Sequence, residues 1–168
     1  MGNKVMAETI APDNERAMIE IDKRDLVFSV HVYAVMVRDG KILISPQWKE
    51  NGYDFPGGRV ELGENHKATI IREVKEETGF TVTPTQIIEV FTSLFKHPKR
   101  EKPYHSILIY YSAEIESGDI STEGFDEHEM DYAREARFVT LDELKSMELM
   151  SNQKVLEPIY KYLEKLGL

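Results

Sequence analysis

The sequence contains no cysteine, which excludes disulfide scaffolds, thiolate zinc sites and cysteine nucleophiles. It also contains no apolar run near the roughly 18–20 residues that a membrane-spanning helix needs. Basic residues are few, with 21 Lys and Arg against 30 Asp and Glu, so the net charge is −9. Because such a surface repels a phosphate backbone, we expect no binding to polymeric nucleic acid. A small anionic substrate stays compatible with this charge, since a bound cation inverts the local field.

The 168 residues suffice for one domain with short appendages. We expect that domain at residues 25–168, after an N-terminal segment, residues 1–24, that forms a strand or contacts a second subunit. Within this segment, residues 18–21 could begin either a strand or a short helix, and a homodimer is one expected assembly. The first six residues lack the apolar core of a signal peptide, so we expect a soluble, cytoplasmic protein without a membrane partner.

Apolar alternation and turn signals divide the rest of the chain into strands and helices. Strands are predicted at residues 26–37, 41–44, 87–95, 106–115 and 135–139, and helices at residues 65–78, 141–147 and 155–166. Asp39-Gly40 predicts a hairpin turn, and Gly79 predicts the C-terminal cap of the first helix. Residues 51–63 are rich in glycine and indicate a loop or an irregular strand, and residues 118–133 indicate an acidic, exposed loop. Since strands and helices alternate irregularly, the pattern favours an α+β fold with a mixed sheet over a doubly wound one.

The predicted helix at residues 65–78 carries an acidic face. Glu73 and Glu77 are one turn apart, Glu76 lies beside them, and four apolar residues on the opposing arc are expected to pack on a sheet: Ala68, Ile70, Ile71 and Val74. Like charges at this spacing cost about 0.2–0.5 kcal/mol, and carboxylates in the last turn cost about 0.3–1 kcal/mol against the helix dipole. A divalent cation bound at this face would turn both penalties into favourable interactions. A solvated acidic face without a metal is equally compatible with the pattern of the helix alone.

The spacing around this helix favours the metal site. It runs from Gly58 through Glu64, Arg72-Glu73-Val74 and Glu76-Glu77 to Gly79-Phe80, and it resembles the Nudix box at every defining position. Outside the box, Phe55-Pro56-Gly57-Gly58 resembles the family's entry to the helix, and residues 137–144 resemble its late strand and helix. The resemblance implies an α/β/α sandwich around a mixed β-sheet. It also implies a hydrolase of nucleoside diphosphate derivatives that uses Mg²⁺ or Mn²⁺.

Carried onto this sequence, the resemblance assigns roles to residues of the box. Glu73 and Glu77 would be metal ligands, and Glu76 would bind a second ion or act beside the catalytic base. The carbonyl of Gly57 or Gly58 would be a further ligand in the substrate-binding loop. Arg72 would orient the glutamates, and Glu64 would start the helix or hold water. Magnesium is commonly held by one or two carboxylates together with waters and substrate phosphates, which agrees with this assignment.

Two loops supply the remaining candidates. The general base is expected from the acidic loop, with Glu127 and Glu129 first and Glu123 and Asp126 behind them; a solvated loop is the alternative. A basic cluster between two strands, including Lys96 and Arg100, could attract the substrate's phosphates, and a solvated hairpin loop is again the alternative.

Three functions are compatible with the fold that the resemblance implies. The first is a metal-dependent pyrophosphohydrolase acting on a small nucleotide substrate, such as a nucleoside triphosphate or a nucleotide sugar. The second is a non-catalytic Nudix domain that senses a nucleotide metabolite. The third, an isoprenoid diphosphate isomerase, is disfavoured because that chemistry is tied in the family to a cysteine. The proline that usually marks ADP-ribose cleavage is absent or displaced here, since Pro98 lies eighteen residues after Phe80.

Overall fold

A computed structural model describes residues 2–10, 16–47, 52–97, 100–121, 135–147, 149–151 and 153–168. Its larger sheet has six strands in the order β2-β1-β8-β9-β3-β7. Their bounds are β1 Lys4–Ile10, β2 Arg16–Asp22, β3 Val27–Val35, β7 Gly57–Arg59, β8 Thr81–Lys96 and β9 Tyr104–Ser117. The central strands β3 and β9 are parallel, whereas β8 and β9 are antiparallel. The sheet is therefore mixed, as expected.

A smaller sheet has the order β10-β5-β4, and β6 also pairs with β5. Its strands are β4 Val37–Arg38, β5 Lys41–Pro46, β6 Tyr53–Asp54 and β10 Arg137–Val139. The turn between β4 and β5 has positive φ at Asp39 and Gly40, as the Asp-Gly pair predicts. This sheet matters for the site because β5 brings residues 44–46 beside the larger sheet.

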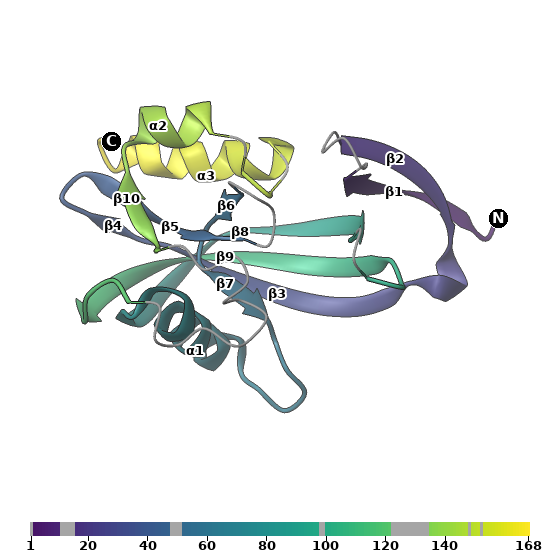
Figure 1. Cartoon of the computed structure of the whole chain (residues 1–168), viewed down its shortest axis with the longest axis horizontal. Helices are drawn as coiled ribbons and strands as arrows, with labels where there is room; N and C mark the ends of the chain where they lie inside the picture. Colours follow the sequence, from purple (N-terminus) through teal and green to yellow (C-terminus); the bar gives the residue numbers. More distant parts are fainter. Residues whose placement is uncertain are drawn as a thin grey trace.

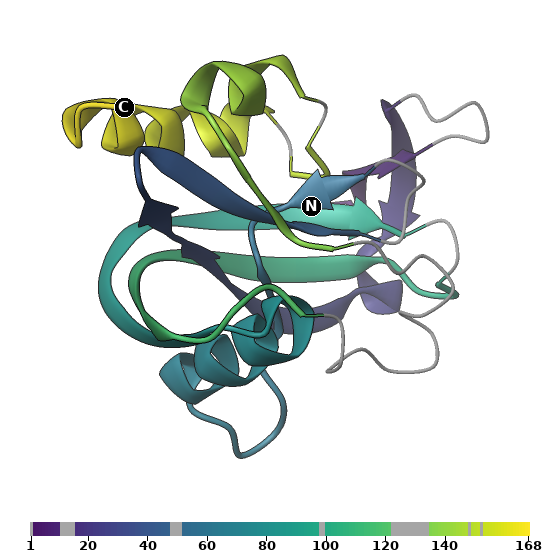
Figure 2. The same cartoon turned by 60° about the vertical axis from the view of Figure 1, so that its left-hand side comes forward.

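Helices cover the larger sheet on both sides (Figures 1 and 2). Helix α1, His66–Thr78, lies on one face, and α2, Leu141–Ser146, and α3, Gln153–Lys165, lie on the other. Each face has its own apolar cluster: Ile70 and Val74 of α1 pack with Val32, and Leu156 and Ile159 of α3 pack with Tyr110. The α/β/α sandwich and the α+β class are thus confirmed. Among the described residues, no helix is long and apolar enough to cross a membrane.

Helix α1 is capped at both ends, at the predicted Gly79 and at Asn65, which was predicted as its first residue. The Asn65 side chain accepts a hydrogen bond from the Lys67 N–H, and Gly79 ends the helix in the left-handed conformation with φ 81°. The predicted buried arc was partly wrong, because Ala68 and Ile71 are exposed. Ile70 and Val74 are buried as predicted, and Thr69 and Thr78 join them. The contact face is therefore rotated toward the Glu73–Glu77 side of the helix, which brings both glutamates close to the sheet.

The N-terminal segment forms a hairpin within the larger sheet. Strand β2 confirms the strand alternative for residues 18–21, while β1 was not predicted. Strands β8 and β9 are longer than their apolar patterns indicate, and residues 51–63 contain the short strands β6 and β7. Strand β7 pairs with β3 so that Gly57 faces Tyr33 and Gly58 faces Val32. This pairing sets the glycine-rich loop against the C-terminal half of α1, where Glu73 and Glu77 lie.

Candidate active site

The carboxylate of Glu77 is held between two strands. Its Oε2 accepts hydrogen bonds from the Gly57 N–H at 3.0 Å and from the Ser45 hydroxyl at 2.9 Å. Ser45 lies on β5 and is fully buried. Both donors are neutral groups that orient the carboxylate without adding a positive charge of their own. A carboxylate fixed in this way is suited to bind a cation.

The carboxylate of Glu73 lies directly against Gly58. A methyl group added at Gly58 would be 2.4 Å from both Cδ and Oε1 of Glu73. The Glu73 side chain is only 16% exposed, and its Oε1 lies 3.0 Å from a guanidinium nitrogen of Arg72. Glycine at position 58 therefore leaves room for the Glu73 carboxyl, which would have to move if the residue carried a Cβ.

Arg72 joins three carboxylates. Its guanidinium makes two bonds to Glu64, at 2.9 and 3.1 Å, and one to Glu76 at 3.0 Å, in addition to the Glu73 contact. These bonds hold the pKa of the Glu64 carboxyl at about 2, well below its usual value. Glu64 also accepts from the hydroxyl of buried Thr69. The predicted orienting role of Arg72 and the predicted place of Glu64 at the helix start fit these contacts.

The backbone at Gly57 has a conformation that side chains rarely adopt. Its φ is 152°, and a methyl group there would be 2.0 Å from the Val32 carbonyl oxygen. Only glycine lets the loop lie this close to β3 while its N–H reaches Glu77. Gly57 thus serves the fold, and Gly58 serves the side chain of Glu73.

The glutamates of α1 and the glycine loop suit a divalent cation. Arg72 supplies one positive charge beside the three carboxylates of Glu64, Glu73 and Glu76. In the part of the chain that the structure describes, no three His, Asp or Glu side chains are gathered as a complete ligand set. Mg²⁺ does not need one, because it keeps several waters and takes further oxygens from substrate phosphates. Two oriented carboxylates beside a loop with room only for glycine fit that coordination.

The basic residues predicted to bind substrate lie at the other end of the sheet. Lys96 is the last residue of β8, and the preceding Phe95 pairs with Tyr104 at the start of β9. Gly57 pairs with Tyr33, which in turn pairs with Tyr110, six residues further along β9. Six residues of strand separate the two levels, which is about 20 Å. The Lys96 ammonium donates to the carbonyl oxygens of Arg100 and Glu101 and so closes its own loop. The structure therefore does not bring Lys96 and Arg100 to the glutamates.

The candidate general bases Glu127 and Glu129, with Glu123 and Asp126, lie outside the described residues. The described residues on either side of them are close to the site. The Ser121 N–H donates to the carbonyl of Thr78, next to Glu77, at 3.1 Å. On the other side, Arg137 of β10 pairs with Ile44, next to Ser45. The assignment of the base to this stretch stays a prediction.

Sequence reasoning missed Ser45 and Tyr33. Ser45 follows an apolar strand run as a polar residue, and that break in the pattern was a usable signal. Tyr33 faces Gly57, and burial together with the charges of Asp54, Glu77 and Glu73 raises the pKa of its phenol far above the usual range. Nothing in the local sequence distinguishes Tyr33 from a core aromatic, because its neighbours come from distant segments.

Comparison with known proteins agrees with this geometry. The NUDIX domain model matches residues 27–163. The chain is 28% identical over 138 residues to an ADP-ribose pyrophosphatase of Methanocaldococcus jannaschii, covering 80% of this chain and 74% of that protein. It is 35% identical over 74 residues to the asymmetrical bis(5'-nucleosyl)-tetraphosphatase of Mus musculus, covering 44% and 49%.

Solved structures share the fold. A NUDIX hydrolase from Nitrosomonas europaea superimposes with a TM-score of 0.63 at 22% identity, over 83% of this chain and 90% of that one. The chain spans less than half the length of some curated relatives, such as 43% of one from Bacillus subtilis. The family model nevertheless covers most of this chain, including the glycine loop, α1 and β10. We conclude that the chain belongs to the Nudix hydrolase family.

Proposed function

We propose that this protein is a Mg²⁺- or Mn²⁺-dependent pyrophosphohydrolase that cleaves the diphosphate linkage of a small nucleoside diphosphate derivative. The observation that carries the proposal is the pair of oriented carboxylates at the glycine loop. Glu77 is fixed by Gly57 and Ser45, and Glu73 is fixed by Arg72 against Gly58. Divalent metals are general to the family, which supports the choice of cofactor.

In this proposal Glu73 and Glu77 hold the metal, with Glu76 and the carbonyl of Gly57 as further ligands. When bound, the cation would neutralise the diphosphate and activate a water for attack on phosphorus. Arg72 keeps Glu73 and Glu76 in place, and Glu64 in turn fixes Arg72. Attack of water breaks one P–O bond of the diphosphate bridge, releasing two phosphate monoesters and a proton. Glu127 or Glu129 would accept that proton.

The substrate class is proposed to be a nucleoside diphosphate joined to a sugar. An ADP-ribose pyrophosphatase aligns with four-fifths of this chain, and ADP-ribose is a compound of that class. Nucleoside triphosphates are the second candidate from the sequence. In either case the shared chemical feature is the diphosphate, which the metal binds.

The test measures phosphate and nucleotide release from ADP-ribose, nucleotide sugars, nucleoside triphosphates and dinucleotides, with Mg²⁺ and with Mn²⁺. Glu77→Gln is the blank, because glutamine can still accept from Gly57 and Ser45 but carries no charge. Glu61→Gln, at an exposed glutamate of the same loop, is the matched control. We expect turnover to fall by well over tenfold in Glu77→Gln alone. Binding of one nucleotide without product in the wild type would instead identify a sensing domain.

A further inference from the structure

Among the residues that the structure describes, β2 forms an open edge of the larger sheet, with β1 as its one neighbouring strand in that sheet. The two strands pair without a break over seven residues, and the Lys23 N–H continues the ladder to the Asn3 carbonyl at 2.7 Å. Backbone bonds in an antiparallel pair alternate along each strand. The N–H and C=O groups directed away from β1 therefore belong to Arg16, Met18, Glu20 and Asp22. An edge strand of seven residues presents a row of unpaired backbone groups, which can pair with a strand of another chain.

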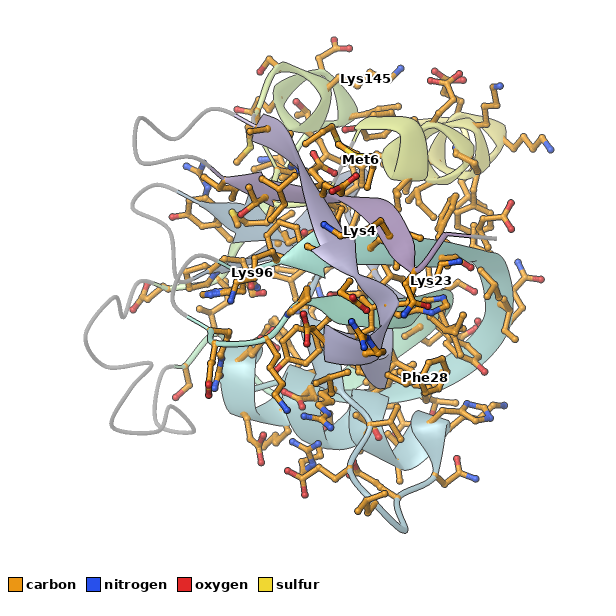
Figure 3. The ribbon with its side chains drawn as sticks, turned by 90° about the vertical axis from the view of Figure 1, so that its right-hand side faces the viewer. Lys4, Met6, Lys23, Phe28, Lys96 and Lys145 are labelled. Carbon is orange, nitrogen blue, oxygen red and sulfur yellow. The ribbon has the colours of Figure 1, made fainter. Side chains whose placement is uncertain are left out.

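The two faces of this hairpin differ in polarity. On the outer face, Met6 and Met18 are 49% and 59% exposed, and they lie among the ion pairs Lys4–Glu20 and Arg16–Glu8. Figure 3 looks onto this end of the molecule and labels Lys4 and Met6. The inner face of β2 is apolar and half-buried, and it consists of Ala17, Ile19 and Ile21. An added strand would therefore extend an apolar face as well as the hydrogen bonds.

We propose that β2 pairs with β2 of a second copy of this chain, antiparallel, about a two-fold axis through Ile19. Ile19 is the middle residue of the strand, so this register uses all four outward-facing residues of each copy. It places Arg16 opposite the partner's Asp22 at both ends, and Ile19 against the partner's Ile19 on the apolar face. The strand is thus complementary in charge to itself, as an isologous interface requires.

Neighbouring registers with the same backbone alternation are less favourable. A shift that centres the axis on Met18 leaves Asp22 without a strand partner and loses one pair of opposed residues at each end. A shift that centres it on Glu20 sets two like charges directly opposite each other, which is destabilising. Both residues of the proposed ion pair already have partners within their own chain: Asp22 accepts from the Arg24 N–H at 2.9 Å and pairs with the Arg24 guanidinium. Arg16 pairs with Glu8 and donates to the carbonyl oxygens of Leu149 and Met150. The proposed register leaves these contacts in place and adds the attraction between the opposite charges of Arg16 and the partner's Asp22 across the edge.

Single cysteines test both the contact and its register, because the chain has no native cysteine. In Ile19→Cys the two Cα atoms would be about 4.5 Å apart as a non-hydrogen-bonded pair, within the range for a disulfide. In Met18→Cys they would be about 8 Å apart, and in Met6→Cys about 16 Å, both beyond it. We expect covalent dimers on non-reducing gels after oxidation for Ile19→Cys, and none for the other two variants.

Sedimentation velocity of the unmodified protein completes the test. We expect a dimer whose fraction rises with concentration, and its loss in Met18→Pro, which removes an N–H from the open edge but none directed to β1. Cross-linking of Met18→Cys in preference to Ile19→Cys would overturn the proposal, as would a monomer at every concentration or a dimer that survives Met18→Pro. The proposal is independent of hydrolysis, since Ile19 belongs to the edge and the glutamates to α1.

Discussion

Replacing Gly57 or Gly58 by alanine should have different effects, one on the stability of the fold and one on the position of a metal ligand. In Gly58→Ala the new methyl group meets the end of a flexible side chain, 2.4 Å from the Glu73 carboxyl, so the carboxyl moves and the backbone does not. In Gly57→Ala the methyl group meets the Val32 carbonyl oxygen at 2.0 Å, where φ is also unfavourable for alanine. The first change displaces a metal ligand, and the second strains the fold.

The expected magnitudes separate the two cases. Gly58→Ala should change the free energy of unfolding by no more than about 1 kcal/mol, since alanine also restricts the unfolded chain. Its kcat/KM should fall by about 10–100-fold, as for lost positioning of a metal ligand. Gly57→Ala should lose about 2–4 kcal/mol of stability, and each 1 kcal/mol corresponds to about 2–4 °C in Tm for a chain of this size.

The assay pairs thermal unfolding with initial rates across a Mg²⁺ titration. Gly2→Ala is the control, because a methyl group there has no atom within 4 Å. We expect Gly58→Ala to need more Mg²⁺ at nearly unchanged Tm. Full activity of Gly58→Ala at unchanged Mg²⁺ dependence would refute the role given to Glu73, and a fully stable Gly57→Ala would refute the role given to the Gly57 backbone.

Three further predictions follow from the same contacts. Ser45→Ala removes a hydrogen bond to Glu77 and should lower kcat/KM by about tenfold with about 1 kcal/mol lost in stability; equal rates in both proteins would contradict this. Because Arg72 holds the pKa of folded Glu64 at about 2, the stability that Glu64 contributes is complete above its usual pKa of 4.5 and is lost as the pH falls toward 2. Urea midpoints should therefore fall less steeply over this window in Glu64→Gln than in the wild type, and parallel curves would argue against the pairing. Asn65→Ala should cost about 1 kcal/mol through the lost helix cap, measured as a Tm lower by about 3 °C, and an unchanged Tm would show that the cap contributes nothing.

Local patterns predicted the parts of the fold that local physics determines. The stop at Gly79 and the Asp39-Gly40 turn each depend on a few adjacent residues, and both are present. Asn65 was predicted inside the helix, and it caps the helix instead. The long strands β8 and β9 were underestimated, because pairing with a neighbour extends them past their apolar cores. Strand β1 was missed for the same reason, since its partners are β2 and a short stretch of β8.

In the candidate site too, the features within one helix could be predicted, and those that depend on distant segments could not. The order of glutamates in α1 was visible in the sequence, but the rotation of the helix that turns them toward the sheet was not. Ser45 and Gly57 meet Glu77 from segments 32 and 20 residues away, so no local pattern connects them. Conversely, Lys96 and Arg100 looked suited to phosphate binding by charge alone, and the strand register places them about 20 Å along the sheet from the glutamates.

Binding of Mn²⁺, followed by the loss of the free-ion signal in electron paramagnetic resonance, tests most directly whether the acidic side of α1 is a metal site. We expect the wild type and Glu61→Gln to bind Mn²⁺ alike, and Glu77→Gln to bind at least tenfold more weakly at an unchanged Tm. Equal Mn²⁺ affinity in all three proteins would contradict the assignment of Glu77 as a ligand, whatever their activities.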